Sequence, residues 1–90
     1  MANLIYTDTY IKKAKKFVKK HPDMLKQYEK TLLLLEENPY HPSLRLHKLE
    51  GNLSEINSVS INLIYRISMD FIIEKDNIIL INVGKHDEVY

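Results

Sequence analysis

Apolar residues recur at helical spacing near the start of the chain, and lysines fill most of the positions between them. The apolar positions are Ile11, Ala14, Phe17 and Val18. This spacing predicts an amphipathic helix with a strongly basic outer side. Thr7 or Asp8 is the expected N-cap, because its side-chain oxygen can accept from the free backbone N–H groups of the first turn. His21-Pro22 is expected to end the helix, since proline disfavours helical geometry in the residue before it.

A second helix is predicted from about Pro22 to Glu37. Its apolar face consists of Met24, Leu25, Tyr28, Leu32 and Leu35. The four consecutive leucines 32–35 make the end of this helix apolar nearly all round. One side is expected to face the core, and the other favours a protein partner as its cover.

From Leu44 onward the apolar residues follow strand-like patterns. We expect strands around 44–49, 56–61, 64–73 and 77–83, joined by turns at 50–52, near Asn62 and at 74–77. Asn3 to Tyr6 suits a short edge strand. Two helices followed by hairpin-linked strands predict an α+β fold, in which two N-terminal helices pack on one face of a small twisted antiparallel sheet.

The length of 90 residues predicts a single domain, 1–90, with one modest core. The chain is 44% hydrophobic and 28% charged, as in ordinary globular proteins. No apolar run approaches the ~20 residues of a membrane span, and no secretory signal is recognisable. The absence of cysteine is compatible with a cytoplasmic location, which we expect.

The net charge of +1 conceals an uneven distribution. Residues 1–30 carry eight lysines and three acidic residues, for a net charge of +5, whereas residues 31–90 have a net charge of −4. A basic face can bind phosphates or an acidic partner. For lysines alone, a solvated helix surface is an equally simple explanation.

The motifs exclude several classes of chemistry. The four histidines show no helical pairing with a carboxylate as third ligand, and there is no thiolate, so we expect no metal site. A chain with two glycines offers no phosphate-binding loop, and no serine has a nucleophile-elbow context. We therefore expect no cofactor.

A small set of basic and aromatic residues remains. Its members are Arg45, His47, Lys48, Arg66, Lys85, His86 and Tyr90. Strand alternation would put Arg45 and His47 on the same side, and the last three follow a buried strand directly. Three simpler explanations stay open: an ion pair of Arg66 with an acidic residue (Glu55, Asp70 or Glu74), an exposed His47, and a solvated chain end.

If these groups converge, they suit metal-independent RNA cleavage. A base must take the proton of the attacking 2′-hydroxyl, and an acid must protonate the leaving 5′-oxygen. His47 and His86 suit these roles, because imidazole titrates near neutrality. Arg66 suits bidentate phosphate contact, and Tyr90 can stack on a base or help to transfer a proton.

The order of motifs resembles the RelE/ParE superfamily of toxin–antitoxin toxins over nearly the whole chain. The resemblance rests on the lysine-rich first helix, Leu46 to Leu53, Ile61 to Arg66 with its Tyr65-Arg66 pair, and the ending Val83 to Tyr90. It is most similar to the RelE and YafQ branch, whose members cut messenger RNA in the ribosomal A site.

The resemblance implies roles for individual residues on the concave face of the sheet. His47 corresponds to the general base of YafQ-like toxins, and Arg66 to the arginine that contacts the scissile phosphate. His86 corresponds to the C-terminal catalytic residue and Tyr90 to the terminal aromatic. Arg45, Lys48 and Lys85 are expected to bind RNA phosphates. A protein antitoxin is the expected partner, together with messenger RNA on the ribosome, and no membrane.

The chain departs from similar toxins at Ser58 to Ser60, where many of them carry a second basic residue, and at Glu55, where a glycine is common. Its low net charge is a further difference. Two alternatives therefore remain beside the nuclease. One is a ParE-like toxin that poisons DNA gyrase, and the other is a non-catalytic relative that only binds an antitoxin.

Overall fold

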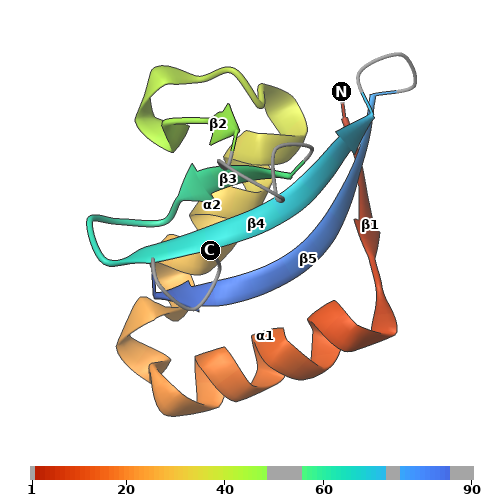
Figure 1. The fold of residues 1–90 in the computed structure, drawn as a ribbon. Coiled ribbons are helices and arrows are strands. Elements are labelled where there is room, and N and C mark those ends of the chain that lie inside the picture. The colour runs from red at the N-terminus through yellow and green to blue at the C-terminus, as the bar shows by residue number, and fades with distance from the viewer. Residues whose placement is uncertain (1, 49–55, 73–75, 86–90) are drawn as a thin grey trace.

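The computed structural model describes residues 2–48, 56–72 and 76–85 (Figure 1). For residues 71–72 it describes the backbone alone. Its elements, in chain order, are β1 (Asn3–Tyr6), α1 (Asp8–Lys20), the 3-10 helix η1 (Pro22–Met24), α2 (Leu25–Glu37), the 3-10 helix η2 (Pro42–Leu44), β2 (His47–Lys48), β3 (Asn57–Ser60), β4 (Tyr65–Ile72) and β5 (Asn77–Lys85). No helix in these residues is both long and apolar enough to cross a bilayer.

The first helix begins and ends where the sequence predicts. The Thr7 hydroxyl caps α1 by accepting from the Tyr10 N–H at 3.1 Å, and it donates to the Leu80 carbonyl at 3.2 Å. At the other end the His21 N–H reaches the Phe17 carbonyl. Pro22 starts a short 3-10 turn, so α2 begins at Leu25, slightly later than expected.

The strands form one five-stranded sheet in the order β1-β5-β4-β3-β2. Strands β2 to β5 are antiparallel neighbours, as expected. β1 instead runs parallel to β5, with Asn3 opposite Asn77, so the sheet is mixed. A parallel pair needs a long crossover connection, and everything between β1 and β5 serves as that connection here. The predicted α+β class with two N-terminal helices is confirmed.

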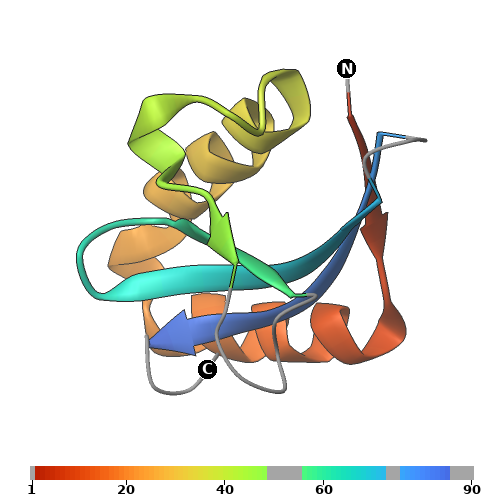
Figure 2. The ribbon, with the colours of Figure 1, turned by 45° about the horizontal axis from the view of Figure 1, so that its top comes forward.

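Both helices cover the same face of this sheet: α2 crosses behind β3 and β4, and α1 runs along β5 (Figures 1 and 2). The largest fully buried side chains on this face and at its rim are Tyr10, Leu35, Leu44, Val59, Ile67, Met69, Ile78 and Leu80. The hydroxyl groups of Tyr10 and Tyr28 are 2.6 Å apart and satisfy each other inside this core. Burial raises the pKa of both phenols.

The other face of the sheet is polar. Strand pairing places Ser58 opposite Ser68 and Ser68 opposite Asn82, and it places Ser60 opposite Arg66. Directly opposed residues share a face, so these side chains all lie on the face away from the helices. His47, opposite Ser58, joins them. Two of the candidate residues of the sequence analysis, His47 and Arg66, therefore lie on the face that the helices do not cover.

The segment before β3 differs from the expected strand over 44–49. Pro42–Leu44 is a 3-10 turn, and Arg45 is left-handed with φ 50° and ψ 49°. In the described part of this segment, only His47–Lys48 pairs with β3, and Leu49 lies outside the described residues. The predicted strand alternation between Arg45 and His47 is therefore wrong, because the backbone at Arg45 is left-handed and not extended.

Candidate functional site

Arg66 is at the centre of a polar cluster at the start of β4. Its Nε donates to the Ser58 hydroxyl at 3.0 Å, and one terminal nitrogen donates to the Arg45 carbonyl at 3.2 Å. The same nitrogen lies 3.1 Å from Nδ1 of His47. We call Arg45, His47, Ser58 and Arg66 the Arg66 cluster. It brings residues far apart in the sequence onto one end of the polar face.

Strand pairing explains why the cluster forms. Arg66 lies opposite Ser60, so Ser58 is its diagonal neighbour across the β3–β4 ladder, within reach of a long side chain. His47 lies opposite Ser58 on the other side of β3. The left-handed backbone at Arg45 turns its carbonyl toward both Arg66 and His47. The guanidinium is thus held between two segments, β3 with Ser58 and the stretch 45–47 with the Arg45 carbonyl and the His47 ring.

The imidazole of His47 has two arrangements available. Its Nδ1 is 3.1 Å from the Arg66 nitrogen and 3.2 Å from the Arg45 carbonyl. When Nδ1 carries the proton it donates to the carbonyl, which leaves Nε2 as the lone-pair nitrogen that a general base needs. When Nε2 carries the proton, Nδ1 can accept from Arg66 instead. The Arg45 carbonyl thus favours the tautomer suited to a base, whereas Arg66, which can only donate, favours the other tautomer.

The other predicted phosphate ligands are more dispersed. The Arg45 side chain is exposed, and within the cluster this residue contributes its carbonyl. Lys48 is exposed and follows His47 on a strand, so it faces the opposite side. Lys85 lies opposite Tyr65 and not on the face of Arg66. His86 and Tyr90 lie outside the described residues, so their approach to Arg66 stays a prediction.

An ion pair was the alternative explanation for Arg66. Asp70 lies further along the same strand, opposite Ile79, and it is not among the described contacts of Arg66. Glu55 and Glu74 lie outside the described residues. The described contacts of the guanidinium are a hydroxyl, a carbonyl and an imidazole, and none of these groups is negatively charged.

The serine at position 58 has a clear structural role. Its side chain is completely buried, and its hydroxyl accepts from Arg66. Similar toxins were expected to carry a second basic residue in the segment 58–60. Here β3 instead supplies the neutral hydroxyl of Ser58, which fixes the direction of the Arg66 guanidinium.

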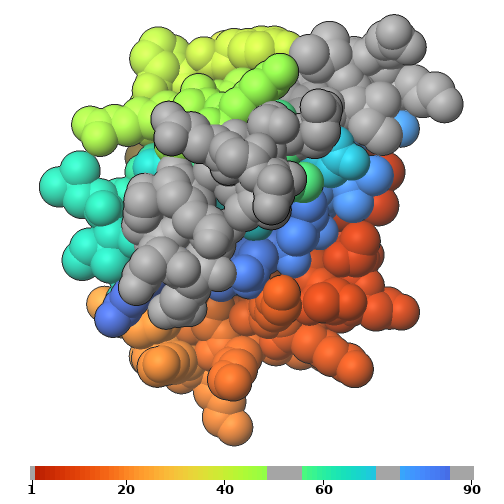
Figure 3. Space-filling view, viewed as in Figure 1, coloured from red at the N-terminus to blue at the C-terminus, as the bar shows by residue number. Residues whose placement is uncertain are grey.

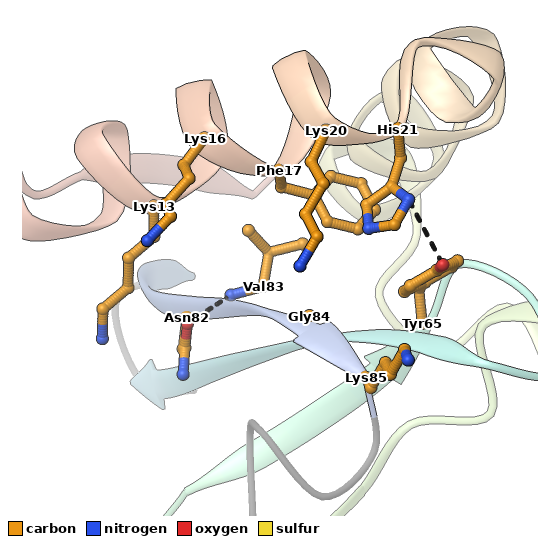
Figure 4. Close-up of a pocket in the computed structure, with 10 residues that line it drawn as sticks. All are labelled: Lys13, Lys16, Phe17, Lys20, His21, Tyr65, Asn82, Val83, Gly84 and Lys85. Atoms are coloured by element: carbon orange, nitrogen blue, oxygen red, sulfur yellow. Dashed lines mark hydrogen bonds between the residues drawn. The ribbon is translucent and has the colours of Figure 1, made fainter.

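A second feature was not predicted as a site. A pocket of about 440 Å³ lies between α1 and β5, and Figure 4 shows lysine side chains of α1 extending over the strand. Its basic residues are Lys13, Lys16, Lys20 and Lys85, and its aromatic residues are Phe17, His21 and Tyr65. The three helix lysines are three and four residues apart, a spacing that puts them on one side of a helix. Lys12, Lys15 and Lys19 have the same spacing, so the sequence alone does not distinguish the lysines that line the pocket.

The described residues contain no group of three or more His, Cys, Asp or Glu side chains arranged to hold a metal ion. The Arg66 cluster itself places an imidazole beside a guanidinium. Such a pair can move a proton and stabilise negative charge on a phosphate.

Comparison with known proteins identifies the fold. No protein-family model matches this chain, and no curated protein matches it significantly. Among solved structures, Escherichia coli YafQ of strain BL21(DE3) is similar with a TM-score of 0.79 and 16% identity, covering 100% of this chain and 99% of YafQ. A metal-bound toxin from Helicobacter pylori is similar with a TM-score of 0.77 and 23% identity, covering 100% of both chains. A chain of the E. coli DinJ–YafQ toxin–antitoxin complex is similar with a TM-score of 0.77 and 15% identity, covering 99% of this chain and 97% of that one.

These similarities extend over essentially the whole chain, so the protein has the α+β fold of RelE-like toxins. Among the toxins of this fold, YafQ is a full-length structural match. The expected resemblance to the RelE and YafQ branch is thus supported at the level of the fold.

Proposed function

We propose that this chain is the toxin of a type II toxin–antitoxin system and acts as a ribosome-dependent messenger RNA endonuclease. The observation that carries the proposal is the contact between Arg66 and His47, 3.1 Å apart on the polar face of a RelE-like fold. A cation next to an imidazole can supply two of the groups that cleave RNA through its own 2′-hydroxyl, a base and a stabiliser of phosphate charge.

In this proposal His47 takes the proton of the attacking 2′-hydroxyl while its Nδ1–H is held by the Arg45 carbonyl. Arg66 stabilises the negative charge that develops on the scissile phosphate, because its guanidinium is already oriented by Ser58. His86 protonates the leaving 5′-oxygen, and Tyr90 stacks on a neighbouring base. Arg45, Lys48 and Lys85 bind flanking phosphates. No metal or cofactor takes part.

An antitoxin partner is part of the same proposal. One of the similar structures is a toxin–antitoxin complex, DinJ–YafQ. The α2 helix of this chain leaves Leu33 65% exposed on the side away from the core, and Leu25 is also exposed. The predicted apolar excess of this helix thus remains on the surface, where an antitoxin helix can cover it.

The ParE-like and non-catalytic alternatives make different demands. A gyrase poison or a simple antitoxin-binding protein does not need an arginine oriented against a histidine. Holding a guanidinium in one direction costs side-chain entropy. The nuclease interpretation gives this orientation a use, and the two alternatives do not, so the Arg66 cluster favours the nuclease.

The test is inducible expression followed by sequencing of messenger RNA 5′ ends, for the wild type beside Arg66→Ala and His86→Ala. We expect new 5′ ends within reading frames for the wild type, and none for either variant. Each variant must still co-purify with the antitoxin, which shows that it folds.

Other outcomes have definite meanings. Growth arrest without new 5′ ends would move the assignment to a gyrase-type target. No arrest at all, with antitoxin binding intact, would favour the non-catalytic relative. Full cleavage by His86→Ala would show that the acid is another group.

A further inference from the structure

The pocket between α1 and β5 lies along an edge of the sheet that no described strand covers. β1 pairs with β5 only from Asn77 to Leu80, because the chain turns into α1 after Tyr6. Beyond Leu80, α1 runs beside the strand instead, and its side chains form the lower margin of the molecule in Figure 3. The α1–β5 pocket, of about 440 Å³, opens at this place.

The charge of the α1–β5 pocket is strongly positive. Its basic lining residues are Lys13, Lys16 and Lys20 from the helix and Lys85 from the end of β5. The described lining includes no Asp or Glu. Like charges around one cavity repel each other, and a bound anion would relieve that repulsion. The pocket is therefore suited to a ligand with more than one negative charge.

The inner wall of the pocket is aromatic. The ring of His21 lies 4.8 Å from that of Tyr65 and 5.1 Å from that of Phe17, measured between centroids. The Tyr65 hydroxyl is 3.4 Å from Nδ1 of His21. Proteins that bind single-stranded nucleic acids combine planar side chains with cations. The bases stack on the rings, and the lysines contact the phosphates.

We propose that the α1–β5 pocket binds a stretch of single-stranded RNA next to the position that is cleaved. This inference rests on the proposed nuclease function. Tyr65 and Arg66 are consecutive in β4 and face opposite sides, and their partners in β5 are Lys85 and Gly84. The pocket and the Arg66 cluster are thus back to back at one end of the same two strands. An RNA strand that passes around this end contacts both.

RNA fits the pocket better than an acidic peptide does. Peptides commonly bind an open sheet edge by adding a strand, through backbone hydrogen bonds. Here the Val83 N–H already donates to the side-chain oxygen of Asn82 at 2.9 Å, so it is not available to an added strand. Lysines also project over the same edge, as Figure 4 shows, and edge lysines oppose strand addition. Phosphates need only flexible cations.

The experiment compares two triple variants of equal net charge. In the pocket variant Lys13, Lys16 and Lys20 become Gln, and in the matched control Lys12, Lys15 and Lys19, on the same helix but outside the pocket lining, become Gln. The probe is a short RNA with methylated 2′-hydroxyls, which can bind but cannot be cleaved. Affinity is measured by fluorescence anisotropy over a range of salt concentrations.

The pocket variant is expected to bind roughly tenfold more weakly and to lose about 2 from the slope of log affinity against log salt, since each phosphate contact on a single strand contributes about 0.7. The control variant is expected to change much less. In the wild type the His21 ring resonances shift on adding RNA, and they do not in the pocket variant.

Equal losses in both variants would overturn the proposal, because they would show general attraction to a basic helix. Preference for oligoglutamate over RNA of the same charge would overturn it in favour of an acidic peptide. The proposed nuclease function is judged separately, because the probe cannot be cleaved. Loss of binding in the pocket variant alone, with no messenger RNA cleavage by the wild type, would retain the RNA site and reject the nuclease.

Discussion

Nε of Arg66 donates a hydrogen bond to the buried hydroxyl of Ser58, at 3.0 Å across the β3–β4 ladder. This bond decides where the rest of the guanidinium points. With Nε held, the terminal nitrogen reaches both the Arg45 carbonyl and the His47 ring. Ser58 therefore orients the guanidinium of Arg66 without adding a charge of its own.

Replacing Ser58 by Ala removes the acceptor and frees the guanidinium to rotate. We expect the rate of messenger RNA cleavage to fall roughly tenfold or more, the value of a hydrogen bond to a charged group. The measurement is cleavage in a purified translation system. Ser68→Ala is the matched control, since Ser68 is also buried on the polar face but is not among the described contacts of Arg66. An equal loss in both variants would contradict an orienting role for Ser58.

The buried phenol pair allows a test of core energetics. Tyr28→Phe should lower the free energy of unfolding by about 1–3 kcal/mol, because the Tyr10 hydroxyl is then left without its partner in the core. Changing both residues to Phe should recover part of that loss, since no hydroxyl stays unsatisfied. Urea unfolding of the two single variants and the double variant measures the coupling. Strict additivity of the single effects would show that the hydroxyl contact contributes nothing.

The same pair predicts the dependence of stability on alkaline pH. Burial is the main cause that raises the pKa of Tyr10 and Tyr28, so the folded state favours the neutral phenols. Their contribution to stability is complete below the ordinary tyrosine pKa of about 10, and it declines as the pH rises above that value. The melting temperature of the wild type should therefore fall more steeply above this pH than that of the double Phe variant. Parallel curves would argue against it.

Arg45 allows backbone and side-chain roles to be separated. Its φ of 50° costs a residue with a side chain about 1–2 kcal/mol, whereas glycine adopts this geometry freely. Arg45→Gly should therefore leave the free energy of unfolding unchanged or slightly higher, while keeping the carbonyl that holds Arg66 and His47. If the side chain binds RNA as proposed, the salt slope of RNA binding should fall by about 1. An unchanged slope would confine the role of Arg45 to its carbonyl.

The local features of the fold could be predicted from the sequence because their causes are local. Thr7 caps α1 and His21-Pro22 ends it, as short-range hydrogen bonding and proline geometry require. Tyr10 was missed as a core residue, although its side chain has no exposure. A tyrosine can be fully buried only if its hydroxyl finds a partner, and the partner, Tyr28, lies on the next helix.

The site could be predicted only in part, because it depends on contacts between distant segments. Arg66 and His47 were both candidates in the sequence, and the strand register brings them within 3.1 Å of each other. The left-handed turn at Arg45 has no signature in its residue type, and it changes which atom of that residue enters the cluster. The lysines of α1 are alike in sequence, and only the position of β5 distinguishes those that line the pocket from those that face solvent.

The parallel pairing of β1 with β5 also has a consequence for synthesis. Among the described strands β1 is made first, yet its partner in the sheet, β5, is made last. Until Asn77–Leu80 emerges, the apolar residues of β1 and the inner side of α1 have no strand to pack on. Most of the chain must therefore be made before the sheet closes and Arg66 acquires its neighbour Gly84. The polar face that carries the Arg66 cluster is thus completed late, after both helices that cover the opposite face have been made.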